Sequence, residues 1–252
     1  MGQISESRAW EILKAYARDC IQIDFESLLA IYAIGSLPGG YYRPGQSDID
    51  AVLITTNGSE KIWGDVHEAS QTLKDLNERY LRAYEIPKDF GPFPIQEGEL
   101  FPPYNPAKEL AAEIARLKLQ GKPVYGDFNL QSVPMPTPGD FLRDAQHFEE
   151  WWRDEFSKTN PLETLSATGC VNTILAHLRR YLRIKRGKIV FDKHKVVPEY
   201  LCNDPPIADE QMFRLVEQFL RLGEASDRDT RELRRYVGVL RDAMNSHLGI
   251  ST

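Results

Sequence analysis

Two short apolar segments, joined by a loop that cannot form a long regular element, constrain the fold of this sequence most. Residues 28–34 (LLAIYAI) are apolar throughout and are followed by Gly35, a pattern typical of a strand that is buried on both faces. Residues 50–55 (DAVLIT) predict a second buried strand. Residues 36–47 between them are rich in Gly, Pro and Ser. We therefore expect a loop whose two ends are fixed by neighbouring strands.

Further patterns divide the chain into a mixed half and a helical half. Helical spacing of apolar residues predicts helices over 5–23 and 59–80, and a third apolar run predicts a short strand over 81–86. Residues 88–106 are rich in proline, which makes regular structure there improbable. We therefore place a domain boundary at 106/107. Beyond the boundary, residues 123–126 are either an edge strand or an extended linker, and the rest is helical: 107–120, 139–156, 164–186, 209–222 and 229–248.

The composition is that of a soluble globular protein, with 42% hydrophobic and 27% charged residues. The 31 Lys and Arg against 37 Asp and Glu give a net charge of −6, which argues against a nucleic-acid partner. Three widely spaced cysteines indicate neither a zinc site nor a disulfide framework, so we expect a cytoplasmic protein. The polar N-terminus and the lack of a run of about 18 apolar residues predict no membrane association.

Two aspartates open the second predicted strand. Side chains at positions i and i+2 of a strand lie on one face, so Asp48 and Asp50 would point together toward the loop while Ile49 faces the core. Two neighbouring carboxylates repel each other, and a hard divalent cation removes that repulsion. Mg²⁺ is the natural occupant, particularly if substrate phosphates supply further oxygens. The simpler alternative is that Ser47 and Asp48 cap a turn and Asp50 faces solvent.

The loop beside these aspartates has the residues of a phosphate-binding turn. Gly35 allows the backbone to approach a phosphate closely, and Ser36 offers both a hydroxyl and an amide to its oxygens. Gly39 and Gly40 would let the loop curl back toward the second strand. Together with the aspartate pair, the loop predicts a site for a metal-bound phosphate compound.

Residues 34–54, IGSLPGGYYRPGQSDIDAVLI, resemble the glycine-serine and paired-aspartate signature of the DNA polymerase β-like nucleotidyltransferases. The resemblance implies an α/β (α+β) nucleotidyltransferase domain with a small mixed sheet over 1–106, followed by an all-α helical-bundle domain over 107–252 that binds substrate and nucleotide. It also implies transfer of a nucleoside monophosphate from a Mg²⁺-bound nucleotide, with release of pyrophosphate. Ser47 would join Gly35 and Ser36 in holding phosphate oxygens.

Members of that superfamily often use a third carboxylate on a neighbouring strand. The candidate is Glu85, within the third apolar run, and Asp89 is the fallback. Glu85 would deprotonate the acceptor hydroxyl or complete the metal shell. The alternative is that Glu85 faces water at a strand end.

A second resemblance is to the streptomycin/spectinomycin adenylyltransferases, which join such a domain to a helical one. Residues 171–189, VNTILAHLRRYLRIKRGKI, are similar to a helix of those enzymes that ends in a Gly-Lys-Ile turn. The resemblance implies that Arg179 and Lys193 bind the triphosphate of the nucleotide, with Lys188 and Lys195 as alternatives to Lys193. The competing interpretation is that this basic helix simply presents a solvated face.

The acceptor is less well defined by the sequence. Those enzymes hold their polycationic drug with carboxylates shortly before that helix, whereas residues 166–169 here are Ser-Ala-Thr-Gly. Nearby side chains that could stack on a ring or meet an amine are Trp151, Trp152, Glu149, Glu150 and Asp154, although two aromatics on an amphipathic helix more often belong to a core.

We therefore expect a Mg²⁺-dependent enzyme, monomeric or homodimeric, that transfers AMP from ATP to a hydroxyl of a small molecule such as an aminoglycoside-like antibiotic. An antitoxin-like nucleotidyltransferase that adenylylates a partner protein is the first alternative. The second is a module that binds a nucleotide without turning it over.

Overall fold

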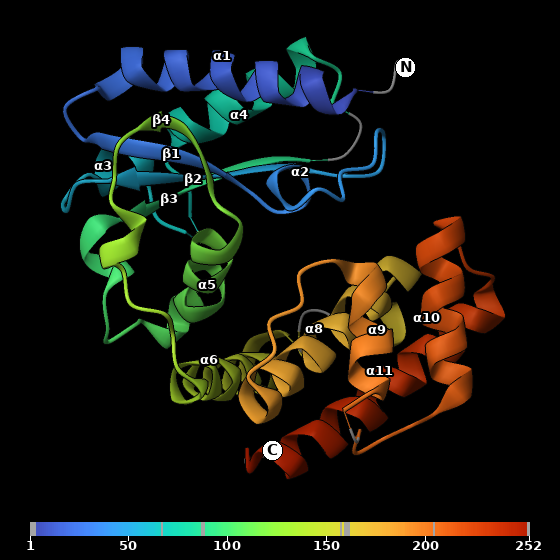
Figure 1. Ribbon diagram of the computed structural model, residues 1–252. Coiled ribbons are helices and arrows are strands. Elements are labelled where there is room, and N and C mark those ends of the chain that lie inside the picture. Colours follow the sequence, from blue (N-terminus) through green and yellow to red (C-terminus); the bar gives the residue numbers. More distant parts are fainter. Residues whose placement is uncertain are drawn as a thin grey trace. The chain divides into compact units, whose positions relative to one another are not determined.

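A computed structural model describes residues 4–66, 68–86, 89–156, 158, 162–203 and 205–250. The chain divides into two compact units, Met1–Pro136 and Thr137–Thr252 (Figure 1). The boundary predicted at 106/107 therefore lies too early. Helix α5 (Leu110–Gln120) and strand β4 (Lys122–Gly126) belong to the first unit, because β4 completes its sheet and α5 packs against strand β1 (Leu28–Ile34).

The first unit is built on a four-stranded mixed sheet in the order β3-β2-β1-β4. The central strand β1 is antiparallel to β2 (Ile49–Thr55) and to β4, while β2 is parallel to β3 (Phe90–Gln96). The bounds of β1 agree with the sequence pattern, and β2 begins one residue earlier than predicted. The segment 123–126 lies in an edge strand, which was one of the two structures predicted for it. The prediction of a small mixed sheet is confirmed.

Helices cover the two faces of this sheet differently. Helices α1 (Glu6–Asp24) and α4 (Gln71–Ala83) lie over one face, and α5 lies on the other (Figure 1). Ile49, Ala51 and Leu53 of β2 belong to the same buried apolar cluster as residues of α1 and α4. Because side chains alternate along a strand, Asp50 must point to the opposite face, where α5 lies.

The helix predicted over 59–80 is interrupted. It begins as the short helix α3 (Glu60–Trp63) and ends at Gly64, whose φ of 84° is unfavourable for other residues. A Cβ atom at position 64 would lie 2.3 Å from the backbone nitrogen of Ser70. Ser70 then caps α4 by accepting a hydrogen bond from the backbone of Leu73. Residue 67, within the predicted helix, lies outside the described residues.

The strand predicted over 81–86 is wrong. Residues 81–83 complete the last turn of α4, and the chain reverses at Glu85, which has a φ of 50°. The backbone N–H of Ile86 closes this turn onto the carbonyl of Leu81. The third strand instead lies in the proline-rich segment. Proline is tolerated in β3 because an edge strand has an unpaired side, on which no N–H is needed.

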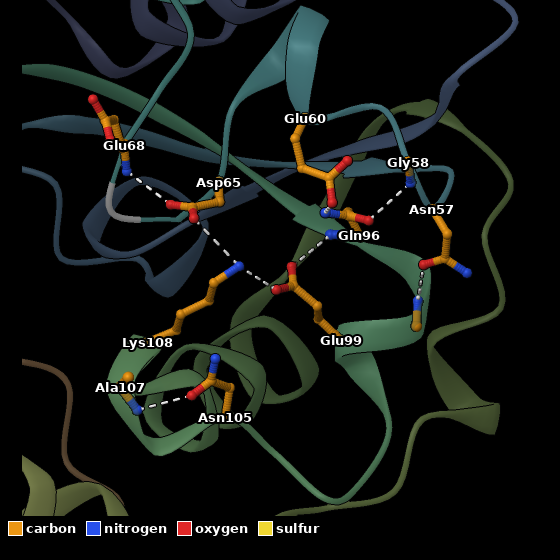
Figure 2. A network of polar contacts seen from close by, with 11 residues as sticks. Asn57, Gly58, Glu60, Asp65, Glu68, Gln96, Glu99, Asn105, Ala107 and Lys108 are labelled. Atoms are coloured by element: carbon orange, nitrogen blue, oxygen red, sulfur yellow. Dashed lines mark hydrogen bonds and ion pairs between the residues drawn. The ribbon is translucent and has the colours of Figure 1, made fainter.

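A network of polar side chains stabilises the end of the sheet that lies away from Asp50 (Figure 2). The Lys108 ammonium lies between the carboxylates of Glu99 and Asp65, which are 2.5 Å and 3.4 Å away. Glu99 accepts a hydrogen bond from the backbone of Gln96, at the end of β3. The Gln96 side chain in turn accepts from the backbone of Gly58. The network thereby joins the short 3-10 helices η1 (Glu97–Leu100) and η2 (Pro106–Lys108) to the loop after β2.

The second unit is helical. Its helices are α6 (Pro138–Trp151), α8 (Ala167–Arg186), α9 (Lys193–Leu201), α10 (Glu210–Leu222) and α11 (Asp227–Leu248), with a π-helical turn η4 (Trp152–Phe156) after α6. Within the described residues, α8 packs against α6, α9, α10 and α11. Helix α9 was not predicted; its interior contains Pro198, a residue that is unfavourable in a helix. No helix in the described part of the chain has the length and apolar character needed to cross a membrane.

Polar groups are buried in this helical core. His177 of α8 is almost fully buried, and its ring makes an edge contact with Phe148. Glu149 of α6 forms an ion pair of 2.7 Å with Arg241 of α11. Burial, with smaller contributions from the Arg180 and Arg241 charges, holds the pKa of His177 well below its usual value, so the imidazole is neutral in the native state.

The buried histidine predicts a dependence of stability on acid. Below about pH 6.5 the unfolded chain binds a proton on this residue that the native state does not, so stability is lost as pH falls. The wild type should lose unfolding free energy between pH 7.5 and pH 5.5. We expect this loss to be about 1 kcal/mol smaller in His177→Gln. Urea unfolding of the full chain at both pH values measures this difference. His147→Gln, at a half-buried position on α6, should keep the wild-type pH dependence; a His177→Gln variant that does the same contradicts the prediction.

Candidate functional site

The paired aspartates lie where β2 begins, on the face of the sheet that α5 covers. Ile49 between them is fully buried, which confirms that it faces the core. The Asp50 side chain is only 23% exposed, whereas Asp48, just before the strand, is exposed. The charge of Asp48 acts on Asp50 and disfavours its ionisation. The two carboxylates are therefore neighbours, as the alternation along the strand predicts.

An arginine that the sequence analysis did not identify neutralises Asp50. The Arg116 guanidinium of α5 donates a hydrogen bond of 2.8 Å from Nη2 to Asp50 Oδ2, and its side chain is three-quarters buried. Arg116 Nη1 also lies 3.5 Å from the Glu113 carboxylate, one helical turn earlier. Burial raises the pKa of Asp50 to about 6, an effect that Arg116 opposes and that Asp48 and Glu113 reinforce. Asp50 is thus a carboxylate that requires a cation beside it.

Gly35 provides the space for this ion pair. Its backbone has φ +79° and ψ −141°, a combination that is almost confined to glycine. A Cβ atom here would lie 2.4 Å from Arg116 Nη2 and 2.8 Å from Asp50 Oδ2. The glycine is therefore needed for the close approach of a guanidinium and a carboxylate to the backbone.

The loop after Gly35 is more ordered than its composition suggests. Ser36 starts a short helix, α2 (Ser36–Gly39), and is half-buried. The Ser47 hydroxyl accepts a hydrogen bond of 2.9 Å from the backbone of Arg43 and so closes the turn before Asp48. The alternative interpretation of the sequence is thus correct in that Ser47 caps a turn. It is wrong in that Asp50 does not face solvent.

The predicted third carboxylate does not lie on a strand. Glu85 is exposed in the turn that ends α4. In the parallel register of β2 and β3, Asp50 lies opposite Gly91, which has no side chain. The fallback, Asp89, is closer to Asp50: a Cβ atom at position 91 would be 3.4 Å from Asp50 Oδ1 and 3.9 Å from Asp89 Oδ2. Asp89 therefore joins Glu113 as an acid near the aspartate pair.

The donor set fits Mg²⁺ that carries a phosphate ligand. The described residues contain no group of three or more His, Cys, Asp or Glu side chains placed to hold a metal ion. Mg²⁺ commonly takes one or two protein carboxylates and fills its remaining positions with water and substrate phosphates. Asp48 and Asp50 match that need, provided that Arg116 shares or releases the Asp50 carboxylate.

The predicted phosphate-binding residues of the second unit lie near one another. Arg179 of α8 donates a hydrogen bond of 2.6 Å to the carbonyl of Phe191, which precedes α9. Lys193, the first residue of α9, is exposed. Of its two alternatives, Lys195 is also exposed, whereas Lys188 forms an ion pair with Glu199.

Two of the proposed acceptor-binding side chains belong to the core. Trp152 is buried, and Glu149 is buried in its ion pair with Arg241. Trp151 is 39% exposed, and the exposed Asp154 pairs with its neighbour Arg153. Glu150 is exposed and lies 3.7 Å from His147.

Arg116 and Glu113 escaped the sequence analysis because the helix that carries them was assigned to the other domain. A weak signal was present: an acid and an arginine three residues apart in the otherwise apolar segment LAAEIARL. Such a spacing places both charges on one side of a helix. Only the packing of α5 against the sheet shows that this side faces Asp50.

Comparisons with known proteins bear on the fold. No protein-family model matches the sequence, and no curated protein matches it. Among solved structures, spectinomycin adenyltransferase AAD(9) from Enterococcus faecialis, with ATP and spectinomycin, is similar with a TM-score of 0.63 and 15% identity, over 95% of this chain and 99% of that one. A toxin-antitoxin structure with AMP-PNP matches 58% of this chain and 92% of that one at 14% identity, but its TM-score of 0.31 is too low to bear on the fold. The first likeness confirms the predicted nucleotidyltransferase fold with its helical second part.

The close packing around Gly35 predicts a loss of stability on substitution. Gly35→Ala should lower the free energy of unfolding by roughly 3 kcal/mol, because the methyl group meets the Arg116–Asp50 pair in a strained backbone conformation. Gly40→Ala is the matched control. Gly40 also has a positive φ, of 76°, but nothing lies within 4 Å of its Cβ position, so we expect a cost of only about 1 kcal/mol. Equal costs for the two variants in urea unfolding would contradict the packing argument.

Proposed function

We propose that this protein transfers AMP from Mg²⁺-bound ATP to a hydroxyl group of a small molecule and releases pyrophosphate. The observation that carries the proposal is the pair of carboxylates at the start of β2, one of them largely buried, beside the Gly35–Ser36 turn. The likeness in fold to an adenyltransferase with ATP, along nearly the whole chain, supports it.

In this proposal Asp48 and Asp50 hold the metal ion. When bound, Mg²⁺ neutralises charge on the phosphates of the nucleotide and so makes the α-phosphorus more susceptible to attack. The protein contributes the fixed position of the carboxylates. Asp50 is held on a central strand, and its burial keeps competing water away from one side of the carboxylate.

Other residues act on the phosphates directly. The hydroxyl and backbone amide of Ser36, together with Gly35 and Ser47, bind phosphate oxygens. Arg179 and Lys193 neutralise the pyrophosphate as it leaves. The acceptor oxygen forms a bond to the α-phosphorus, and the bond from that phosphorus to the bridging oxygen breaks, so charge must be balanced on both sides of an in-line displacement.

A base must remove the proton of the acceptor hydroxyl. Glu85 was expected in this role, or as a further metal ligand, but it lies in an exposed turn. Asp89 flanks Gly91 together with Asp50, which favours Asp89 for the same role.

The acceptor is proposed to be a small molecule. The AAD(9) structure contains spectinomycin, a small molecule, and this supports the class. Residues 166–169 of this chain carry no carboxylate, so recognition of a polycation through that segment is not expected. A panel of aminoglycosides, lincosamides and simple alcohols, assayed for pyrophosphate release from Mg²⁺–ATP, identifies the acceptor class.

The first test of the activity is Asp50→Asn. This variant removes one charge without changing shape, and we expect kcat/KM for pyrophosphate release to fall by about 1,000-fold or more. Asp75→Asn, on the exposed side of α4, is the matched control and should keep the wild-type rate. Circular dichroism verifies that both variants are folded. Release at the parent rate by Asp50→Asn would refute the proposal, and ATP binding without turnover on any acceptor would indicate the non-catalytic alternative.

The second test separates the two candidate bases. If Asp89 accepts the proton, Asp89→Asn should lower kcat by about 100-fold, while Glu85→Gln should stay within about twofold of the wild type. Both are exposed acids of the first unit, and each change preserves side-chain shape. The opposite pattern would assign the role to Glu85, as the sequence alone suggested.

A further inference from the structure

We propose that Arg116 is an internal counter-ion that competes with the divalent cation for Asp50, so that the free protein binds metal weakly and Arg116 must release Asp50 before an ion can bind. This inference rests on the metal-binding role proposed for Asp48 and Asp50. It adds a residue from α5 whose function is to set metal affinity.

The contact geometry makes the competition direct. Arg116 Nη2 lies 2.8 Å from Asp50 Oδ2, the distance of a charge-assisted hydrogen bond. A Mg²⁺ ion on the same oxygen would sit about 2.1 Å from it, and so at most about 5 Å from that nitrogen. Two positive groups this close repel each other in a site where both side chains are about three-quarters buried. Metal binding at this oxygen therefore requires the guanidinium to move.

The surroundings hold Arg116 in place while no metal is bound. Gly35 packs against its guanidinium so closely that no Cβ atom would fit between them. Its ion pairs with Asp50 and Glu113 hold the guanidinium from two sides. Arg116 is thus positioned by the fold as a positive charge beside Asp50.

Glu113 offers Arg116 a second position. Its Oε2 atom is buried and accepts no hydrogen bond, although Arg116 Nη1 lies 3.5 Å away. A small shift of the guanidinium toward Glu113 would replace the bond to Asp50 with one to Glu113. Arg116 would then pair with Asp50 before the metal binds and with Glu113 when the metal is bound.

The experiment measures Mn²⁺ binding to the full chain without nucleotide, by electron paramagnetic resonance and calorimetry. We expect Arg116→Gln to bind Mn²⁺ at least about tenfold more tightly than the wild type, because the competing charge is gone. Arg116→Lys keeps the charge and should stay within about threefold. Arg82→Gln, which changes the net charge equally at an exposed position of α4, should bind as the wild type does.

Further variants separate this inference from the proposed function. Asp50→Asn should abolish the tight binding that Arg116→Gln creates. If Asp50→Asn weakens Mn²⁺ binding but Arg116→Gln leaves it unchanged or weaker, the competition is refuted and the metal site stands. If Asp50→Asn has no effect, or if no variant binds Mn²⁺, both proposals fail.

A second measurement covers the case in which Arg116→Gln does not fold. Glu113→Gln removes the charge to which Arg116 would shift, so Mn²⁺ affinity should fall by about threefold or more. Unchanged or increased affinity in a folded Glu113→Gln variant, verified by circular dichroism, would overturn the proposal.

Discussion

A carboxylate that is largely removed from water on the face of a sheet must have positive charge beside it, and the first unit is organised around that requirement. Asp50 meets it through Arg116, which is available only because α5 lies against the same face. Gly35 then has to be a glycine, because the ion pair occupies the space of a side chain. The loop, the second strand and α5 are therefore linked by one electrostatic contact rather than by apolar packing alone.

The features that depend on local sequence were predictable, and those that depend on distant contacts were not. The apolar runs defined β1 and β2, and the alternation along β2 placed Ile49 in the core. Arg116 is 66 residues from Asp50 in sequence, so no local pattern joins them. Prolines argued against a strand in residues 88–106, but an edge position tolerates them in β3. The domain boundary was misplaced for the same reason.

The basic helix α8 shows how packing changes the meaning of a charged sequence. A run of arginines on a helix usually indicates a solvated face. Here the Arg180 guanidinium lies 3.5 Å from the centre of the Phe148 ring, and Arg180 is buried. Arg179 bonds to the backbone just before α9 and so fixes the turn that leads to Lys193. Arg179 and Arg180 are thus part of the internal structure of the second unit, and the proposed phosphate role of Arg179 builds on a side chain that is already positioned.

The prolines in the two outer strands have a consequence for assembly. β3 carries Pro92 and Pro94, and β4 carries Pro123, so each edge of the sheet lacks backbone donors that an incoming strand would need. Lys122 adds a charge to the β4 edge. Strand-by-strand growth of the sheet into a continuous intermolecular ribbon is disfavoured on both sides, which protects the protein from amyloid-like aggregation.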